Sequence, residues 1–257
     1  MTAHTSTYVV RFARDEADLR AAQRLRYRVF VEELGGTGPL VDHDARLEAD
    51  ALDPFFDHLL LIDPTRPTGD HVVGAYRLLR GERAAEAGGF YSGSEYDLSP
   101  LIAGGRKLLE LGRSCLDPAH RGGLAMYHLW SALAAYVTEQ EIDILFGVAS
   151  FRGADIMAHA QALTLLHKRH LAPADLRVRA RDEVYMAMDL VPDAQLEPRK
   201  AMLETPALIK AYLKLGGFVG EGVFVDAEFN TTDVCLILDT ARMNDAQKAI
   251  YTREQRG

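Results

Sequence analysis

Residues 107–130, KLLELGRSCLDPAHRGGLAMYHLW, constrain the fold more than any other part of the chain. An apolar run over 107–116 has the composition of a buried strand, and Asp117-Pro118 then breaks it. A Gly-Gly loop with basic neighbours follows and leads into a helix over about 122–140. The sequence therefore predicts a strand–loop–helix unit at the centre of the fold.

The loop of this unit has the properties of an anion site. A helix N-terminus carries unpaired N–H groups and roughly half a positive charge, and glycines let an anion approach the backbone closely. Gly122 and Gly123 stand at that position, with His120 and Arg121 beside them. We expect a phosphate or pyrophosphate to bind here, and a plain strand-to-helix turn is the alternative.

The remaining hydrophobic periodicity predicts one domain over residues 1–257. Its expected class is α/β (α+β), with a mixed, mostly antiparallel central sheet flanked by helices. A long Gly-, Pro- and Asp-rich loop precedes residue 55, and loops of that length are usually functional or disordered. The expected strands are 8–13, 58–62, 72–79, 107–116, 142–150, 183–190 and two within 218–238, and the expected helices are 15–34, 122–140, 154–170 and 199–215.

Charge and composition exclude several classes of function. The net charge of −8 argues against a generally basic, nucleic-acid-binding surface. Cys115 and Cys235 sit in apolar runs without CxxC spacing, so we expect buried thiols rather than a metal or redox site. The N-terminal residues lack the pattern of a signal peptide, and no apolar run reaches the length of about 18 residues that a spanning helix needs. We expect a cytoplasmic protein.

The loop resembles a known acyl-donor motif. His120-x-x-Gly123-x-Ala125 is similar to the acyl-CoA-binding loop of the GNAT N-acyltransferase superfamily, Gln/Arg-x-x-Gly-x-Gly/Ala, and departs from it at the first position. The resemblance implies that the donor's pantetheine arm pairs with the preceding strand. The implied donor-binding residues are His120, Arg121, Gly122, Gly123 and Ala125.

Three further stretches resemble acyl-homoserine-lactone synthases and their relatives. They are LRYRVFVEE (25–33), RLEADALDPFFDHLLL (46–61) and ELGRSCLD (110–117). The synthases carry a Trp shortly after the first stretch, where this chain has Leu34-Gly35-Gly36, and its single Trp is Trp130. Residues 208–238 are similar instead to the bacterial ornithine–acyl-carrier-protein N-acyltransferases, which the chain resembles from about residue 8 to 240.

This resemblance implies a GNAT-like fold with a C-terminal extension, a 3-hydroxyacyl-carrier-protein donor, ornithine as acceptor and lyso-ornithine lipid as product. The expected cofactor set is empty apart from the phosphopantetheine arm of the donor, no metal is expected, and contact with the inner-membrane surface is implied by the amphiphilic product. Two alternatives stay open, an acyl-homoserine-lactone synthase and a non-catalytic GNAT-like module that binds carrier protein or lipid.

The implied chemistry is attack of an α-amine on a thioester, which needs a base because the amine is protonated at pH 7. Glu110 is the first candidate base and Glu48 the second catalytic candidate. A structural pairing of Glu110 with Arg113 is disfavoured, because positions three apart on a strand face opposite sides unless a bulge intervenes, as Gly112 allows. Direct transfer needs no covalent intermediate, so a nucleophilic Cys115 is disfavoured.

Ornithine carries two ammonium groups and one carboxylate. Acidic side chains suit its side-chain ammonium group, and an arginine suits its carboxylate through two parallel hydrogen bonds. The acidic run 48–53 is the candidate for the ammonium group, and a solvated surface is the alternative for it. The candidates for binding the carboxylate are Arg26, Arg77 and Arg113. The implied substrate-binding residues are Arg26, Phe30, Asp50, Asp53, Arg77 and Arg113.

Local basic clusters at 106–107, 167–170 and 177–181 suit an acidic carrier protein or anionic lipid, and solvated surface is the alternative. Apolar residues near the C-terminal helix suit an acyl channel or, more commonly, core packing. These are Ile209, Tyr212, Leu213 and Leu215.

Overall fold

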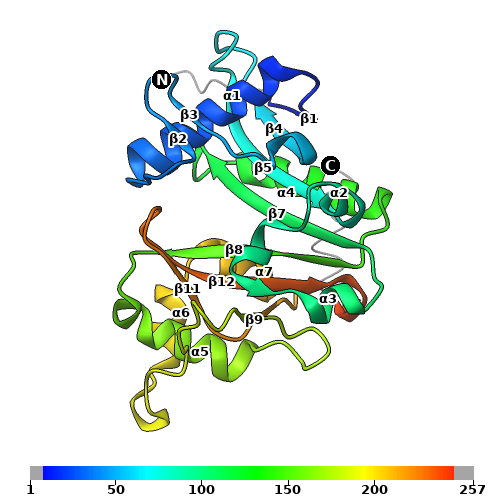
Figure 1. The fold of residues 1–257 in the computed structure, drawn as a ribbon. Coiled ribbons are helices and arrows are strands. Elements are labelled where there is room, and N and C mark those ends of the chain that lie inside the picture. Colours follow the sequence, from blue (N-terminus) through cyan, green and yellow to red (C-terminus); the bar gives the residue numbers. More distant parts are fainter. Residues whose placement is uncertain (1–7, 246–257) are drawn as a thin grey trace. The chain divides into compact units, whose positions relative to one another are not determined.

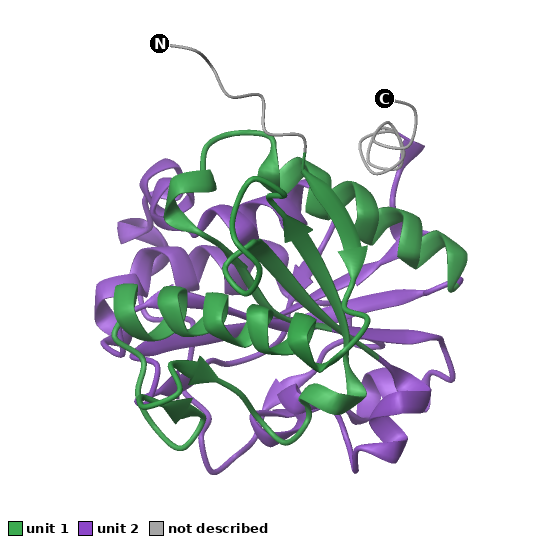
Figure 2. Cartoon of the chain, turned by 90° about the horizontal axis from the view of Figure 1, so that it is seen from above, with its two compact units in different colours: residues 1–79, 111–140, 252–257 green, residues 80–110, 141–251 purple. Residues whose placement is uncertain are grey.

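The computed structural model describes residues 8–245, which divide into two compact units. Within the described part, unit 1 contains residues 8–79 and 111–140, and unit 2 contains residues 80–110 and 141–245 (Figure 2). The expectation of one domain over 1–257 stays a prediction. Each unit is built around part of a mixed sheet, and Figure 1 labels its strands except β10.

Unit 1 contains the strand order β1-β4-β5-β7, and the first two pairings are antiparallel. The strand β7 is divided, because its residues up to Glu110 belong to unit 2. The helices and strands of unit 1 are β1 (Val9–Phe12), α1 (Glu16–Arg26), the π-helix η1 (Tyr27–Glu33), β2 (Val41–Asp42), β3 (Leu47–Glu48), the 3-10 helix η2 (Asp53–Phe55), β4 (Asp57–Ile62), β5 (Val72–Arg80, whose last residue belongs to unit 2), β7 (Leu108–Leu116), the 3-10 helix η4 (Pro118–His120) and α4 (Ala125–Glu139).

Unit 2 contains the order β7-β8-β12-β10, with β11 paired to β12. The pairing of β7 with β8 is parallel and those of β12 with β8, β10 and β11 are antiparallel. The helices and strands of unit 2 are α2 (Gly81–Glu86), η3 (Tyr91–Ser94), β6 (Tyr96–Asp97), α3 (Ser99–Ala103), β8 (Ile144–Arg152), η5 (Ile156–His159), α5 (Ala160–His170), β9 (Arg179–Ala180), η6 (Asp193–Gln195), α6 (Pro198–Glu204), α7 (Ala207–Lys214), β10 (Phe218–Val219), β11 (Phe224–Asp226), β12 (Thr231–Asp239) and η7 (Thr240–Arg242).

The predicted fold class is confirmed, because the eight strands form a mixed, mostly antiparallel sheet with flanking helices. The strand–loop–helix unit is also present as β7, η4 and α4. The strand predicted over 183–190 is wrong, because Met186 makes only an isolated bridge to Val223 and a turn precedes it. The helix predicted over 199–215 is two helices, because Pro206 has no N–H and forces Thr205 into an extended conformation with ψ 132°.

The first predicted helix, 15–34, begins as expected and ends differently. Asp15 caps α1 by accepting a hydrogen bond from the N–H of Asp18. From Tyr27 onward the helix is a π-helix, a rare conformation that occurs mostly as single-turn insertions in α-helices, frequently at functional sites. Periodicity of apolar residues does not distinguish the two helix types over so few turns.

Each unit has its own hydrophobic core. In unit 1 the buried cluster includes Leu25, Val29 and Leu60, and Phe30 packs against it. In unit 2 the cluster includes Tyr96, Phe146 and Ile237. Among residues 8–245, no helix is both long and apolar enough to span a bilayer.

Candidate functional site

Six of the predicted substrate-binding and catalytic residues form one cluster in unit 1. Glu48 lies on β3, Asp50 and Asp53 follow it, Arg26 ends α1, Arg77 lies on β5 and Arg113 on β7. Three guanidinium groups therefore meet three carboxylates, and the charges balance. We call these six residues the arginine–carboxylate network: Arg26, Glu48, Asp50, Asp53, Arg77 and Arg113.

Glu48 and Asp53 are the buried centres of the network. Glu48 accepts hydrogen bonds from Nε of Arg26 and, at 3.0 Å, from Nε of Arg113. Asp53 Oδ1 accepts from Nη1 of Arg26 at 2.7 Å and from Nη1 of Arg77 at 2.8 Å. Arg77 also donates to Asp50 at 2.6 Å. The acidic run is therefore not a solvated surface, because its carboxylates are paired with cations and two of them are buried.

The arginines set the protonation states of the two buried carboxylates. Burial by itself raises the pKa of Glu48, but the guanidinium groups of Arg113 and Arg26 outweigh it and hold the pKa below its usual value. The same balance between burial and the guanidinium groups of Arg26 and Arg77 holds the pKa of Asp53 well below its usual range. Both groups are ionised at neutral pH.

Two members of the network are less deeply buried than the rest. The side chain of Arg113 is 12% exposed and that of Asp50 is 6% exposed, whereas Glu48 is 0% exposed. Arg113 has φ 50°, a left-handed conformation that non-glycine residues adopt at a cost of about 1–2 kcal/mol. We expected a side chain of this strand to change face only where the backbone is irregular, as Gly112 allows. The backbone is irregular at Arg113, the next residue.

Sequence reasoning missed two residues that support the network. Gln23 donates from Nε2 to Asp53 Oδ2 at 2.9 Å, and the ring of Phe56 lies 4.0 Å from the Arg77 guanidinium carbon. Gln23 stands three residues before Arg26 on α1, and that helical spacing was the one signal in the sequence for it. Nothing in the sequence pairs Phe56 with Arg77.

The predicted base Glu110 lies in unit 2. Its Oε2 accepts from the N–H of Tyr91 at 2.8 Å, and its Oε1 accepts from the N–H and Oγ of Ser92, both at 2.6 Å. The side chain is buried. These bonds join β7 to the turn at η3, so Glu110 has a clear structural task in addition to its predicted catalytic one.

The predicted donor loop lies in unit 1. Gly122 has φ 76°, which favours glycine, and no atom stands within 4 Å of a side chain built at Gly122 or Gly123. Within residues 8–245 the N–H groups of these two glycines donate to no acceptor, and both residues are exposed. Ala125 is buried as the first residue of α4. The loop therefore presents open backbone donors at a helix N-terminus.

The side chains of the two basic residues beside the glycines already contact other residues of the protein. Nδ1 of His120 is 2.8 Å from the Tyr8 hydroxyl, and Nε2 is 4.0 Å from Asp63. Arg121 forms two hydrogen bonds to Glu33, at 2.6 and 2.7 Å, and also donates to the Leu116 carbonyl. The backbone of the loop is more accessible to an anion than either side chain.

Both cysteines are buried and unpaired, as expected. Burial raises the pKa of the Cys115 thiol to about 12. The nearby charges of Arg26 and Glu48 have smaller effects, which lower and raise this pKa, respectively. A thiol in that state is a poor nucleophile at neutral pH.

The predicted basic clusters are partly neutralised by carboxylates of unit 2. Lys168 pairs with Asp189 and Asp193, Arg179 with Asp182, and Arg106 with Asp239. Of the apolar residues predicted for an acyl channel or for core packing, Ile209, Tyr212 and Leu215 are buried, which both alternatives allow, so the channel stays a prediction.

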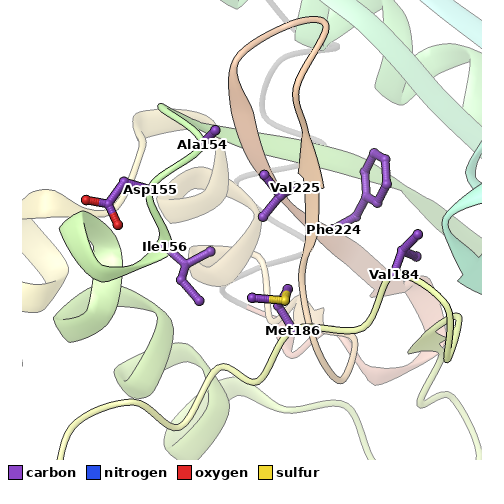
Figure 3. A pocket seen from close by; sticks show the side chains of 7 residues that line it. All are labelled: Ala154, Asp155, Ile156, Val184, Met186, Phe224 and Val225. Atoms are coloured by element: carbon purple, nitrogen blue, oxygen red, sulfur yellow. The ribbon is translucent and has the colours of Figure 1, made fainter.

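One small hollow in unit 2 is shown in Figure 3. Its volume is about 380 Å³, and Ile156, Met186, Phe224 and Val225 are among its lining residues. Asp155 is the one charged residue labelled there, and its carboxylate caps η5 by accepting from the N–H of Met157. The lining is therefore mostly apolar, and its charged side chain already serves as a helix cap.

The chain is similar to proteins of known activity. Residues 25–131 match the acetyltransferase (GNAT) domain family. An L-ornithine N(alpha)-acyltransferase of Rhodobacter capsulatus is 60% identical, over 100% of this chain and 99% of the relative. A protein of the same name from Brucella abortus is 41% identical, over 95% of this chain and 89% of the relative.

The fold is also that of a solved enzyme. FeeM, an N-acyl amino acid synthase from uncultured soil microbes, aligns with a TM-score of 0.53 and 13% identity, over 95% of this chain and 98% of FeeM. The full-length matches to named enzymes favour an acyltransferase over a lactone synthase or a non-catalytic module. The chain belongs to the L-ornithine N(alpha)-acyltransferase family.

Proposed function

We propose that the chain transfers a 3-hydroxyacyl group from acyl carrier protein to the α-amine of ornithine and so forms lyso-ornithine lipid. The amine nitrogen attacks the thioester carbonyl, the C–S bond breaks, and the pantetheine sulfur leaves as a thiol. The names of the full-length relatives support ornithine as the acceptor. The donor and the product follow from the resemblance of the sequence.

The arginine–carboxylate network is the observation that carries the acceptor assignment. Its two most exposed members have opposite charges, Arg113 and Asp50. An amino acid with a basic side chain presents the matching pair, a carboxylate and an ammonium group. We assign the carboxylate of ornithine to Arg113 and the side-chain ammonium to Asp50, while Arg26, Arg77 and Asp53 hold these two side chains in place.

The donor assignment is supported by the loop at 120–125. The open N–H groups of Gly122 and Gly123 at the start of α4 suit the phosphate of phosphopantetheine. Acyl carrier protein and acyl-CoA share this arm, so the loop fits both. A rate comparison between the two donors distinguishes them, and we expect the carrier protein to be preferred.

Of the two candidate bases, Glu110 suits proton transfer better than Glu48. Both carboxylates are buried, but Glu48 is held by two guanidinium groups that lower its pKa, which makes it a weak base. The donors from η3 that contact Glu110 are neutral. We therefore propose that Glu110 accepts the amine proton, directly or through water, and that Glu48 orients Arg113.

The test is a comparison of carboxamide variants in the acyl-transfer reaction. Glu110→Gln should lower kcat by about 10²-fold or more, because a general base typically contributes at least that factor. Glu16→Gln, which alters an exposed carboxylate on α1, should leave the rate unchanged. A Glu110→Gln enzyme with wild-type kcat and an unchanged pH–rate profile would show that the base lies elsewhere.

Asp50→Asn tests the acceptor site through selectivity. Wild-type enzyme should prefer ornithine to norvaline, which lacks the side-chain amine, and the variant should lose about tenfold or more of that preference. General damage to the site would lower kcat/KM for both amino acids equally. An unchanged preference would refute the assignment of Asp50.

We also propose that the reaction takes place on the cytoplasmic side of the inner membrane, with peripheral contact. Leu203 on α6 is 79% exposed, and the exposed Arg199 and Lys200 lie on the same helix. Exposed apolar and cationic residues together suit an anionic lipid surface. Flotation with anionic but not zwitterionic vesicles is expected, and Leu203→Ser should weaken it.

A further inference from the structure

Unit 2 contains a second, larger cavity that the proposed reaction does not use. Its volume is about 800 Å³, and it lies among α2, the segment 88–98, α3 and the first residue of β7. This volume is within the range of roughly 300–1,000 Å³ that is typical of small-molecule sites. We propose that this cavity binds a single-chain amphiphile with a carboxylate head, such as a fatty carboxylate.

The interior of the cavity suits an alkyl chain. Tyr96, Leu98 and Leu108 line it and belong to the buried core, and Phe90 lines it while its ring contacts Phe146 at 5.0 Å between centroids. Ile102 on α3 also lines the cavity and is 58% exposed, so apolar surface continues to the entrance. An alkyl chain placed here would remove apolar area from water, which is the main source of binding energy for such ligands.

The charged groups at the cavity favour an anionic head. Arg181 donates from Nε to the Gly93 carbonyl at 2.7 Å, and among residues 8–245 its other guanidinium nitrogens make no hydrogen bond. Arg106 differs, because both of its terminal nitrogens donate to Asp239. A guanidinium with free terminal N–H groups binds a carboxylate by two parallel hydrogen bonds.

One lining residue, Asp97, carries the opposite charge. The carboxylate of Asp97 accepts hydrogen bonds at 3.0 Å from the N–H and from Oγ of Ser99. These bonds, together with the nearby charge of Arg181, lower the pKa of Asp97, so it is ionised at neutral pH. Because Asp239 already pairs with Arg106, the charges left for a head group at this cavity are Arg181 and Asp97, and removal of Asp97 should favour an anionic ligand.

The walls are held in place without a ligand. Glu110 fixes Tyr91 and Ser92, the Tyr96 hydroxyl donates to the Asp233 carbonyl at 2.9 Å, and the N–H of Arg181 donates to the Glu95 carbonyl at 2.8 Å. A preformed site loses little conformational entropy on binding. This inference does not depend on the proposed acceptor or donor of the acyl-transfer reaction.

Isothermal titration of the full chain with dodecanoate tests the proposal. Arg181→Gln should weaken dodecanoate binding about tenfold or more, and Asp97→Asn should strengthen it. Dodecyltrimethylammonium, which has the same chain length and the opposite charge, should bind more weakly and respond to both variants in the opposite direction. Ala103→Phe, at an exposed lining position, should block both ligands.

Arg177→Gln is the matched control, because Arg177 also donates from Nε to a carbonyl, that of Ala172 at 2.8 Å, and does not line the cavity. It should leave dodecanoate binding unchanged. N-dodecanoylglycine shares the chain and the carboxylate, and its affinity relative to dodecanoate separates an N-acyl amino acid from a free fatty carboxylate. The proposal is overturned if folded wild-type protein does not bind dodecanoate, or if Arg181→Gln and Ala103→Phe leave its affinity unchanged.

Discussion

Glu48→Gln should be the most destabilising single carboxamide substitution in the arginine–carboxylate network. The wild-type carboxylate is fully buried and accepts hydrogen bonds from Arg26 and Arg113. A glutamine removes the charge, and its NH₂ group turns a donor toward one of the two guanidinium groups. Breaking a buried ion pair in this way costs about 3–5 kcal/mol, because a buried cation is left without compensation.

Urea unfolding at pH 7 measures this cost directly. We expect the free energy of unfolding to fall by about 3–5 kcal/mol with an unchanged m-value. Glu16→Gln is the control, because Glu16 forms an exposed pair with Arg20 on α1 and should change stability by less than about 0.5 kcal/mol. A loss below about 1 kcal/mol for Glu48→Gln would refute the view that the network holds a buried, ionised carboxylate.

The pH dependence gives an independent check on the same substitution. The folded-state pKa of Glu48 lies below its unfolded value, so its contribution is present above the unfolded pKa of about 4.3 and is lost as the pH falls through the folded pKa. The stability difference between wild type and Glu48→Gln should therefore shrink in acid. A difference that stays constant from pH 7 to pH 3 would contradict the assigned charge state.

Two further predictions concern packing and thiol reactivity. Gly222→Ala should cost about 1–3 kcal/mol in urea unfolding, because Gly222 has φ 80° and an added Cβ would lie 2.4 Å from the Tyr185 ring, whereas Gly123→Ala meets no atom within 4 Å and should change stability little. Cys115 and Cys235 should resist iodoacetamide at pH 8 in the folded protein and react fully in urea, because burial raises the pKa of both thiols. Rapid labelling of the folded protein would show instead that the strands β7 and β12 open.

The sequence predicted those parts of the fold that depend on local signals. The apolar run of β7, the break at Asp117-Pro118 and the Gly-Gly turn before α4 are all encoded within 25 residues, and the structure contains them in that order. The split between α6 and α7 was also readable, because Pro206 stops a helix, but the apolar periodicity on both sides concealed it. The run at 183–190 has strand composition, yet only Met186 finds a partner.

The pairings inside the candidate site depend on tertiary structure and could not be read from the chain. Arg26 and Glu48 are 22 residues apart, and Arg113 and Glu48 are 65 apart, so no local pattern joins them. The donors that hold Glu110 come from a turn 18 residues earlier. The resemblance to known enzymes predicted which residues belong to the candidate site. The structure shows which of them are buried, which are paired and which are partly exposed.

The most direct test of the central claim is a mass-spectrometric product assay. Purified protein is incubated with a 3-hydroxyacyl-carrier protein and ornithine, and fragmentation of the product locates the acyl group on the α- or the δ-nitrogen. The account predicts an amide at the α-nitrogen of ornithine. Acylation at the δ-nitrogen, or a homoserine lactone formed only when S-adenosylmethionine replaces ornithine, would contradict it.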